Sequence, residues 1–348
     1  MSVIHIRDRV VGAGAPAFVI AEVAQNHDGS LGMAHAFIDA VAAVGADAIK
    51  FQTHIAEAES TLDEPFRTQF SLQDKDRFSY WKRMEFTFEQ WRGLGEHARS
   101  RGLAFLSSPF SIAAVEMLQQ IDMAAWKVGS GELRSLDLLA AMMKSGGAVI
   151  CSTGMAEWAD IDRAVDWLRS NNAAFAVLQC TSAYPTPFEQ VGLQLVDTLR
   201  ARYDCPTGLS DHSGSIYPSL AAIARSAAIV EVHVTFDRAM FGPDVRVSLT
   251  MSELQVVCRM RDAVHAMDSN PVDKNAMSES LAPMRQIFGK SLSLVADLPG
   301  GSIIERHMLT CKKPGTGIPP DRVSELVGRR VRHPVQASRL LRWEDIDD

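Results

Sequence analysis

The chain lacks features that mark several classes of protein: long apolar runs, an excess of basic residues and closely spaced cysteine pairs. No apolar run approaches the ~20 residues of a membrane-spanning helix, and MSVIHIRDRV at the N-terminus has no apolar region of a secretory signal. The net charge of −7 argues against a general nucleic-acid binder, which normally has a basic surface. Five cysteines without a Cys-x-x-Cys spacing favour free thiols in a reducing compartment, so we expect a cytoplasmic protein that binds neither membrane nor nucleic acid.

Short apolar runs recur along the first two-thirds of the chain, and nearly every one ends in a polar or charged residue. In chain order they are AFVIAE, AIKFQ, AFLSSP, AWKVGS, AVICSTG, FAVLQCTS, GLSDH and IVEVHVT. Amphipathic helical patterns such as GMAHAFIDAVAAVG separate them. Regular alternation of strands and helices predicts a parallel sheet. The eight runs predict an α/β fold, a (β/α)8 TIM barrel whose active site lies at the carboxyl ends of the strands.

The composition changes after about residue 267, which divides the chain into regions. Residues 1–267 form the predicted barrel, with an N-terminal hairpin whose turn is expected in VGAGAP. Residues 268–288 are polar and proline-punctuated, and we interpret them as a linker. Residues 289–348 are rich in Gly and Pro and predict a small β-rich domain near the lower size limit for independent folding. We therefore expect this domain to dock on its own barrel or on a partner's.

The segment from His54 to Phe88 is longer than most loops and is polar and aromatic. It forms either a loop over the barrel mouth or a surface excursion without a role. The sequence leaves both interpretations open.

Two histidines and a glutamate at neighbouring strand ends indicate a metal site. His212 and His233 end the seventh and eighth runs, and Glu22 ends the first, which lies beside the eighth in a closed barrel. Imidazole nitrogens, carboxylates and water suit a divalent metal ion. The alternative for either histidine alone is a hydrogen-bonded structural residue.

A lysine inside an apolar run must find an anion, reach water or lose its proton, since an unpaired buried ammonium is costly. Lys50 and Lys127 occupy such positions. Hydroxyls accompany them at the strand ends, from Ser108, Ser130, Ser152 and Ser210. This set suits a phosphate or a phosphorylated acid, while the alternative is lysines that reach solvent and serines that cap helices. A metal beside an anion site suggests metal-assisted chemistry on a phosphorylated substrate. The pattern does not separate an aldolase, a phosphatase and a carbon–carbon-forming synthase.

At these residues the chain resembles the N-acetylneuraminate (sialic acid) synthase family. The matching strings are IAEVAQNHDGS, IKFQTHIAEAE, FLSSPF, KVGSGEL, STGMA, LQCTSAYPTP, GLSDHSGS and EVHVTFDRAMFGPD. KKPGTGIPP lies in the small domain, which resembles the antifreeze-like (SAF) module of that family. The resemblance implies that phosphoenolpyruvate condenses with an open-chain N-acylated hexosamine and releases phosphate. N-acetylmannosamine would give N-acetylneuraminate.

The resemblance also implies roles for individual residues. His212 and His233 would hold Mn²⁺ or Mg²⁺, and Glu22 would be the acid/base carboxylate near the attacking water. The phosphoenolpyruvate cradle would consist of Lys50, Lys127, Ser130, Ser152 and Ser210. The sugar would contact Gln52, Tyr184 and Asp244. Ser108 and Ser182 stand at two further substrate-binding positions. The family usually has threonine at the position of Ser108, and asparagine or serine at the position of Ser182. By pattern alone, Tyr184 is a loop aromatic and Asp244 an exposed turn acid.

The resemblance further implies a domain-swapped homodimer in which the SAF module covers the partner's barrel. The arginine that usually reaches the sugar's N-acyl group is Lys313 here, and lysine lacks the planar donor fork. A legionaminate or pseudaminate synthase that takes a diacetamido-trideoxyhexose therefore remains an alternative. So does a non-catalytic carbohydrate-binding relative, although Glu22, both lysines and both histidines are present. A 3-deoxy-aldulosonate synthase would lack the SAF tail.

Overall fold

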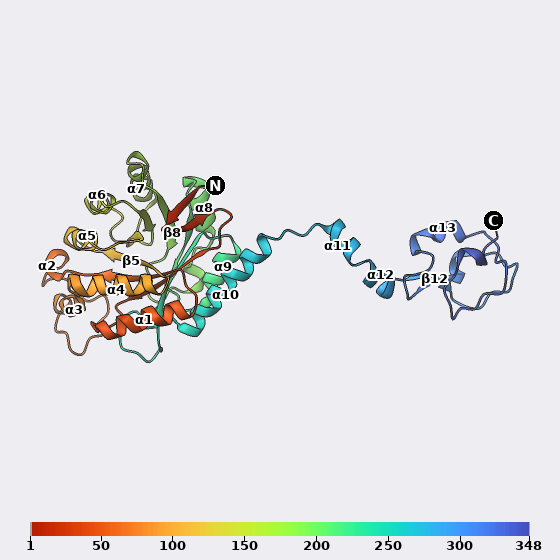
Figure 1. Ribbon diagram of the computed structural model, residues 1–348, viewed down its shortest axis with the longest axis horizontal. Helices are drawn as coiled ribbons and strands as arrows, with labels where there is room; N and C mark the ends of the chain where they lie inside the picture. The colour runs from red at the N-terminus through yellow and green to blue at the C-terminus, as the bar shows by residue number, and fades with distance from the viewer. Residues whose placement is uncertain (1, 348) are drawn as a thin grey trace. The chain divides into compact units, whose positions relative to one another are not determined.

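The computed structural model describes residues 2–347 and divides into two compact units, with the boundary between Ser269 and Asn270 (Figure 1). No helix in the described residues is long and apolar enough to cross a membrane.

The first unit is a closed barrel of parallel strands. The strands are β3 (Phe18–Ala24), β4 (Ala48–Thr53), β5 (Ala104–Pro109), β6 (Ala125–Val128), β7 (Ala148–Ser152), β8 (Phe175–Cys180), β9 (Thr207–Asp211) and β10 (Ile229–Thr235). β10 pairs with both β9 and β3, which closes the ring, and β11 (Ser248–Thr250) adds to β10. The predicted (β/α)8 barrel is confirmed.

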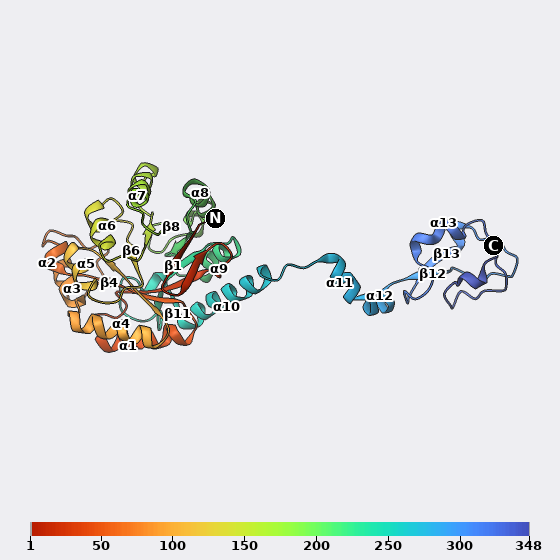
Figure 2. The same cartoon turned by 45° about the horizontal axis from the view of Figure 1, so that its top comes forward.

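Helices surround this barrel (Figure 2). They are α1 (Leu31–Ala43), α4 (Phe88–Ser100), α5 (Ile112–Leu118), α6 (Leu136–Met143), α7 (Trp158–Ser170), α8 (Gln194–Tyr203), α9 (Ile216–Ala224) and α10 (Met251–Asp268). Their apolar faces and the outward side chains of the strands form the largest core cluster. The segment between β4 and α4 holds two more helices, α2 (Ala56–Glu59) and α3 (Arg77–Met84).

The barrel interior changes from apolar to polar along the strands. Ile20, Ala48 and Ile229 belong to one buried cluster, which the N-terminal hairpin completes with Ile4, Ile6 and Val11. Side chains alternate along a strand, so the residues two positions later face the same interior. These residues are Glu22, Lys50 and Glu231. The apolar floor of the barrel thus places a charged layer directly above it.

Close strand packing requires glycine at one point of the ring. A Cβ on Gly208 of β9 would lie 1.9 Å from the carbonyl oxygen of Ile229 on β10. No side chain fits there, so Gly208 allows the last two strands to meet.

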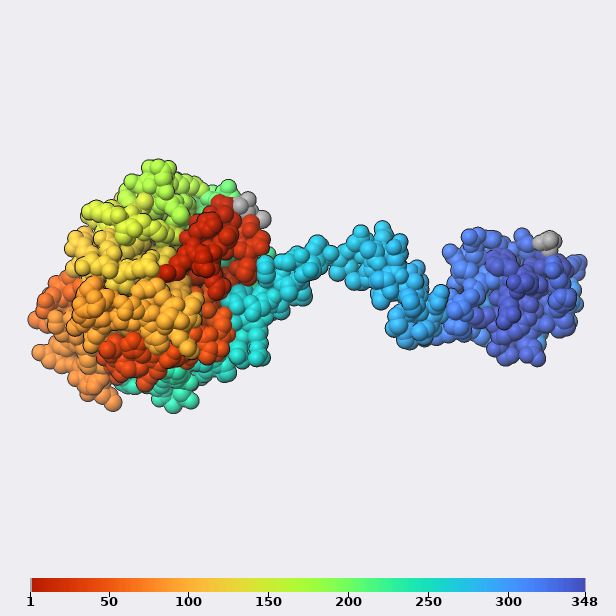
Figure 3. Space-filling model, in the orientation of Figure 1, coloured from red at the N-terminus to blue at the C-terminus, as the bar shows by residue number. Residues whose placement is uncertain are grey.

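The N-terminal hairpin is present, but its turn is not where the sequence suggested. β1 (Val3–Ile6) and β2 (Arg9–Gly12) pair antiparallel, and the turn lies at Arg7 and Asp8 instead of in VGAGAP. Arg7 has a φ of 54°, the left-handed conformation that tight hairpin turns require. The hairpin lies on the surface of the first unit (red in Figure 3).

The second unit has a small core of its own, formed around β12 (Ser291–Leu294), β13 (Leu309–Lys312) and α13 (Val323–Leu326). β12 and β13 pair antiparallel, as a β-rich module requires. The region interpreted as a linker contains two helices, α11 (Lys274–Ser280) and α12 (Ala282–Phe288). The Gly315 amide donates to the carbonyl oxygen of Gln286 at 2.8 Å, which ties α12 to the small core.

Candidate active site

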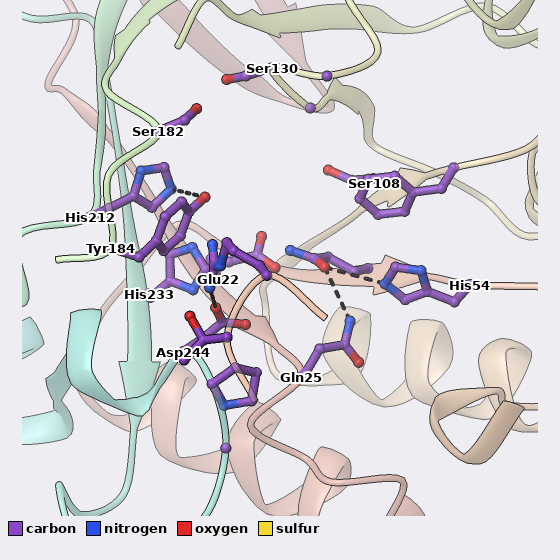
Figure 4. A pocket seen from close by; sticks show the side chains of 18 of the residues that line it. Glu22, Gln25, His54, Ser108, Ser130, Ser182, Tyr184, His212, His233 and Asp244 are labelled. Atoms are coloured by element: carbon purple, nitrogen blue, oxygen red, sulfur yellow. Dashed lines mark hydrogen bonds and ion pairs between the residues drawn. The ribbon is translucent and has the colours of Figure 1, made fainter. Parts of the chain in front are cut away.

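A cavity of about 980 Å³ opens at the carboxyl ends of the barrel strands. Every site residue predicted in the barrel lines it: Glu22, Lys50, Gln52, Ser108, Lys127, Ser130, Ser152, Ser182, Tyr184, Ser210, His212, His233 and Asp244. Figure 4 shows several of these side chains pointing into one space from different strands. The structure therefore brings together residues that lie up to 222 positions apart in the chain (Glu22 to Asp244, 244 − 22).

Both lysines find buried partners and do not reach solvent. Lys50 forms an ion pair with Glu22 and donates to Ser108 Oγ at 3.1 Å. Lys127 Nζ lies 3.3 Å from Glu231 Oε1 and donates to Ser152 Oγ at 2.7 Å. All of these side chains are buried. Each ammonium is thus matched by a carboxylate as well as a hydroxyl.

The two carboxylates have opposite proton affinities. Burial raises the pKa of Glu22 to about 7, even though the charge of Lys50 opposes this. Burial also acts to raise the pKa of Glu231, but Lys127 and Lys50 outweigh it and hold that pKa below its ordinary value. Glu231 therefore favours the ionised form, whereas Glu22 can take up or release a proton near neutral pH.

The two predicted metal-binding histidines lie side by side. The ring centroids of His212 and His233 are 5.1 Å apart (Figure 4). His212 Nδ1 faces the Thr181 carbonyl oxygen at 3.1 Å, so it carries the proton, and Nε2 faces the Tyr184 hydroxyl at 3.2 Å. His233 Nδ1 is buried and has no hydrogen-bond partner in residues 2–347. Burial, followed by the charge of His212, lowers the pKa of His233 well below its ordinary value, which keeps this imidazole neutral.

These histidines fit a divalent metal ion, but Glu22 does not join them as a third ligand. A neutral imidazole nitrogen is the form that binds a metal ion. His233 Nδ1, which is buried without a hydrogen-bond partner among residues 2–347 and lies beside the His212 ring, is such a nitrogen. Glu22 instead pairs with Lys50 and accepts from the Ala24 amide at 2.9 Å. Among residues 2–347, no three His, Cys, Asp or Glu side chains are arranged around one metal position. The expectation of a Glu22 ligand is therefore not met, because the neighbouring lysine engages that carboxylate.

Gly154 packs against three residues that line the cavity, Ser130, Cys180 and Ser182. Its amide donates to Ser130 Oγ at 3.0 Å. A Cβ at this position would lie within 3 Å of Ser130 Oγ, Ser182 Oγ and Cys180 Sγ. A larger residue at position 154 would therefore displace these side chains.

Asp244 is buried, which differs from the exposed turn acid that its local pattern indicates. It precedes a short 3-10 turn, Val245–Val247, whose valines are buried and hold the loop inward. Burial raises the pKa of Asp244, and Arg67 opposes the shift. The Arg67 guanidinium lies 3.6 Å from Asp244 Oδ1 and 3.9 Å from the ring centre of Tyr184.

The segment between β4 and α4 lies over the barrel mouth. Phe66, Arg67, Phe70, Tyr80 and Trp81 all line the cavity. The segment has an apolar cluster of its own, formed by Ala56, Tyr80, Trp81 and Met84. Of the two interpretations that the sequence left open, the loop over the mouth is the one observed.

Comparison with known proteins identifies the family. Residues 37–272 match the sequence model of the NeuB family. The chain belongs to the NeuB family. Residues 289–347 match the SAF domain, so the resemblance read from the motifs is confirmed over both units.

This NeuB-family protein resembles synthases of several nine-carbon sugar acids. It is 32% identical to the N,N'-diacetyllegionaminic acid synthase of Campylobacter jejuni, over 93% of this chain and 98% of the relative. It is also 32% identical to human N-acetylneuraminate-9-phosphate synthase, over 98% of this chain and 95% of the relative. A solved N-acetylneuraminic acid synthetase from Leptospira borgpetersenii superposes with a TM-score of 0.71 at 29% identity and covers 82% of this chain and 96% of its own. The protein is therefore a member of the nonulosonic acid synthases.

Several charged residues line the cavity of this NeuB-family protein without a role assigned from the sequence, and Glu231 and Arg67 are two of them. Glu231 stands two positions before His233 on β10, so the period of the strand already pointed it inward. Arg67 gave no such signal, because the path of a loop is not encoded by periodicity.

Lys313 is the one predicted site residue outside the barrel. Its Nζ lies 5.3 Å from the ring centre of Phe288, within the second unit. Its contact with the sugar of a partner's site stays a prediction.

Proposed function

We propose that the protein condenses phosphoenolpyruvate with open-chain N-acetylmannosamine to give N-acetylneuraminate and phosphate. The observation that carries this proposal is the convergence of Glu22, two buried lysines and two histidines on one cavity. An anionic three-carbon acid and a neutral sugar both need such a mixed lining. Membership of a synthase family supports the reaction class.

The anion-binding half of the cavity is built to receive phosphoenolpyruvate. Lys50, Lys127, Ser130 and Ser152 line the cavity, and Lys127 donates to Ser152 Oγ. The substrate's phosphate and carboxylate oxygens would accept hydrogen bonds from these groups. Because Glu22 pairs with Lys50 and Glu231 with Lys127, the bound anion would share each lysine with a carboxylate.

His212 and His233 would hold a divalent ion, Mn²⁺ or Mg²⁺, which when bound polarises the aldehyde oxygen of the sugar. The Tyr184 hydroxyl lies 3.2 Å from His212 Nε2, the nitrogen that would bind this ion, so the hydroxyl would give up this contact when the ion binds. Asp244 and Gln52 line the same region and would bind sugar hydroxyl groups.

The reaction joins C3 of phosphoenolpyruvate to the aldehyde carbon and leaves positive charge at C2. Water then adds to C2, and the tetrahedral intermediate breaks its C2–oxygen bond to phosphate, which leaves the keto acid. Glu22 accepts one proton of the attacking water and passes it to the former aldehyde oxygen, which becomes a hydroxyl group, while the second water proton leaves with the phosphate. A pKa of about 7 suits this task at neutral pH. Glu231, which stays ionised, holds Lys127 in place for the phosphate.

A legionaminate synthase is the second candidate, because one relative of equal identity carries that name. Its acceptor would be a diacetamido-trideoxyhexose. A pseudaminate synthase is a further alternative with an acceptor of the same class. A non-catalytic carbohydrate-binding protein is disfavoured, since the charged residues that turnover needs all face one cavity.

The test is product analysis with purified full-length protein, phosphoenolpyruvate and Mn²⁺. N-acetylmannosamine and the diacetamido-trideoxyhexoses are offered separately, and the products are identified by mass. A product with the mass of N-acetylneuraminate supports the proposal. Turnover of a diacetamido sugar alone would replace it with the second candidate. We further propose that the protein is a homodimer in which Lys313 completes the partner's site. Light scattering of the full chain would test the dimer through its molar mass.

A further inference from the structure

His54 forms the centre of a three-ring stack in the wall of the cavity. It follows β4 directly and is buried. Its ring lies parallel to Trp81 at a centroid distance of 3.9 Å and to Phe110 at 4.6 Å, with interplanar angles of 13° and 5°. All three residues line the cavity. The ring is therefore fixed on both faces and can interact only through its edge.

Both nitrogens on that edge face oxygen atoms. His54 Nδ1 lies 2.5 Å from Glu59 Oε1, and the other carboxylate oxygen accepts from the Ile55 amide at 3.3 Å. His54 Nε2 lies 3.3 Å from Gln52 Oε1. The same Gln52 oxygen accepts from Gln25 Nε2 at 3.1 Å, and both contacts are drawn in Figure 4.

The donor and acceptor roles follow from these partners. A carboxylate only accepts, so His54 Nδ1 carries a proton. If the Gln52 amide were turned around, its nitrogen would face Gln25 Nε2, and two donors would meet. Gln52 Oε1 therefore faces both His54 Nε2 and Gln25 Nε2. The Gln52 amide nitrogen is left to face the cavity that this residue lines.

We propose that His54 is a positioning residue that fixes the Gln52 amide with its N–H groups toward the acceptor sugar. This inference rests on the proposed function, in which Gln52 is a sugar contact. With its N–H groups toward the sugar, the Gln52 amide can bind a hydrogen-bond acceptor, such as a carbonyl or hydroxyl oxygen of the sugar. A group of the sugar that can only donate would not bind there. Glu59, Trp81 and Phe110 act on Gln52 only through His54.

The first variant is His54→Phe, which keeps a ring between Trp81 and Phe110 and removes both edge contacts. We expect the KM for the acceptor sugar to rise about ten-fold, which corresponds to the loss of one hydrogen bond. The kcat and the KM for phosphoenolpyruvate stay within about two-fold of wild type, a spread too small to represent a lost interaction. His54→Gln serves in its place if His54→Phe does not fold.

The decisive comparison is a double-mutant cycle with Gln52→Ala. If His54 acts through Gln52, the double variant has the acceptor KM of Gln52→Ala alone. Effects that multiply would overturn the inference, because His54 would then act independently of Gln52. A fall in kcat together with an unchanged acceptor KM would overturn it as well.

A measurement without substrate separates this inference from the proposed function. In ¹H–¹⁵N spectra, the side-chain amide signal of Gln52, assigned by its loss in Gln52→Ala, should move in His54→Phe. An unmoved signal would contradict the contact between His54 and Gln52. Absence of turnover with every acceptor would contradict the proposed function, while the spectra still decide the role of His54.

Discussion

Lys127 Nζ lies 3.3 Å from Glu231 Oε1, and Ser210 Oγ donates to the same oxygen at 3.0 Å. The three residues belong to β6, β10 and β9, and all are buried. Before substrate binds, the Glu231 carboxylate is the counter-ion that offsets the desolvation cost of the buried Lys127 ammonium. The substrate anion must therefore bind to a lysine that already forms an ion pair with Glu231.

Glu231→Gln should destabilise the barrel by about 3 kcal/mol, because it leaves the Lys127 charge buried without a counter-ion. Phosphoenolpyruvate should restore more stability to this variant than to wild type. Urea denaturation with and without phosphoenolpyruvate measures both effects. Glu89→Gln, which removes an exposed ion pair with Arg92, is the matched control and should change stability by less than about 1 kcal/mol. Equal stability of the two variants would contradict the pairing.

Glu22→Gln should retain phosphoenolpyruvate binding and lose turnover. The amide has the shape of the carboxyl group but cannot exchange a proton, so we expect kcat to fall at least about 100-fold. Thermal shift with phosphoenolpyruvate reports binding, and phosphate release reports turnover. A variant that turns over at the wild-type rate would remove this carboxylate from the mechanism.

His233→Ala should lose both bound metal and nearly all activity. The buried ring offers an unpartnered nitrogen beside His212, and removing it leaves one imidazole. Metal content after dialysis against Mn²⁺ is measured by elemental analysis, separately from activity. His5→Ala, at an exposed position of the hairpin, is the control that should keep both. Unchanged metal content in His233→Ala would place the metal elsewhere.

His27 should make the fold sensitive to acid. Burial, followed by the charges of His54 and Arg83, lowers its pKa to about 3, against an ordinary value near 6.5. Between these values the unfolded chain binds the extra proton, so stability is present above about pH 6.5 and falls as the pH drops toward 3. The slope reaches about 1.4 kcal/mol per pH unit.

His27→Gln tests this slope, since glutamine can still accept from the Gly29 amide, which lies 3.1 Å from His27 Nδ1. We expect the variant to be less stable than wild type at pH 7.5 and the difference to shrink toward pH 4.5. Urea denaturation at four pH values gives both curves. If the stabilities of wild type and His27→Gln change with pH in parallel, His27 does not cause the loss of stability at low pH.

Strand periodicity predicted the barrel and most of its site because both depend on local sequence. Once Ile20 faces the interior, Glu22 must as well, and the same holds for Ala48 and Lys50. Which carboxylate meets which lysine depends on the pairing of different strands, so the engagement of Glu22 by Lys50 was not foreseen. Neither was the position of Arg67 over Tyr184, because a loop without regular structure leaves no pattern in the sequence.

Errors of local detail have equally physical causes. The hairpin turn falls at Arg7 because a non-glycine residue adopts a left-handed conformation there, while the glycine-rich VGAGAP follows β2. Asp244 looked like an exposed turn acid, yet two buried valines after it pull the loop inward. In both places long-range packing outweighs the local signal.

Phosphate release from phosphoenolpyruvate tests the central claim most directly. Purified full-length protein is given phosphoenolpyruvate and Mn²⁺, with and without N-acetylmannosamine or a diacetamido-trideoxyhexose, and with and without chelator. The account predicts one phosphate per acceptor consumed, none without acceptor and none with chelator. Release that is independent of acceptor, or no release with any of these sugars, would contradict it.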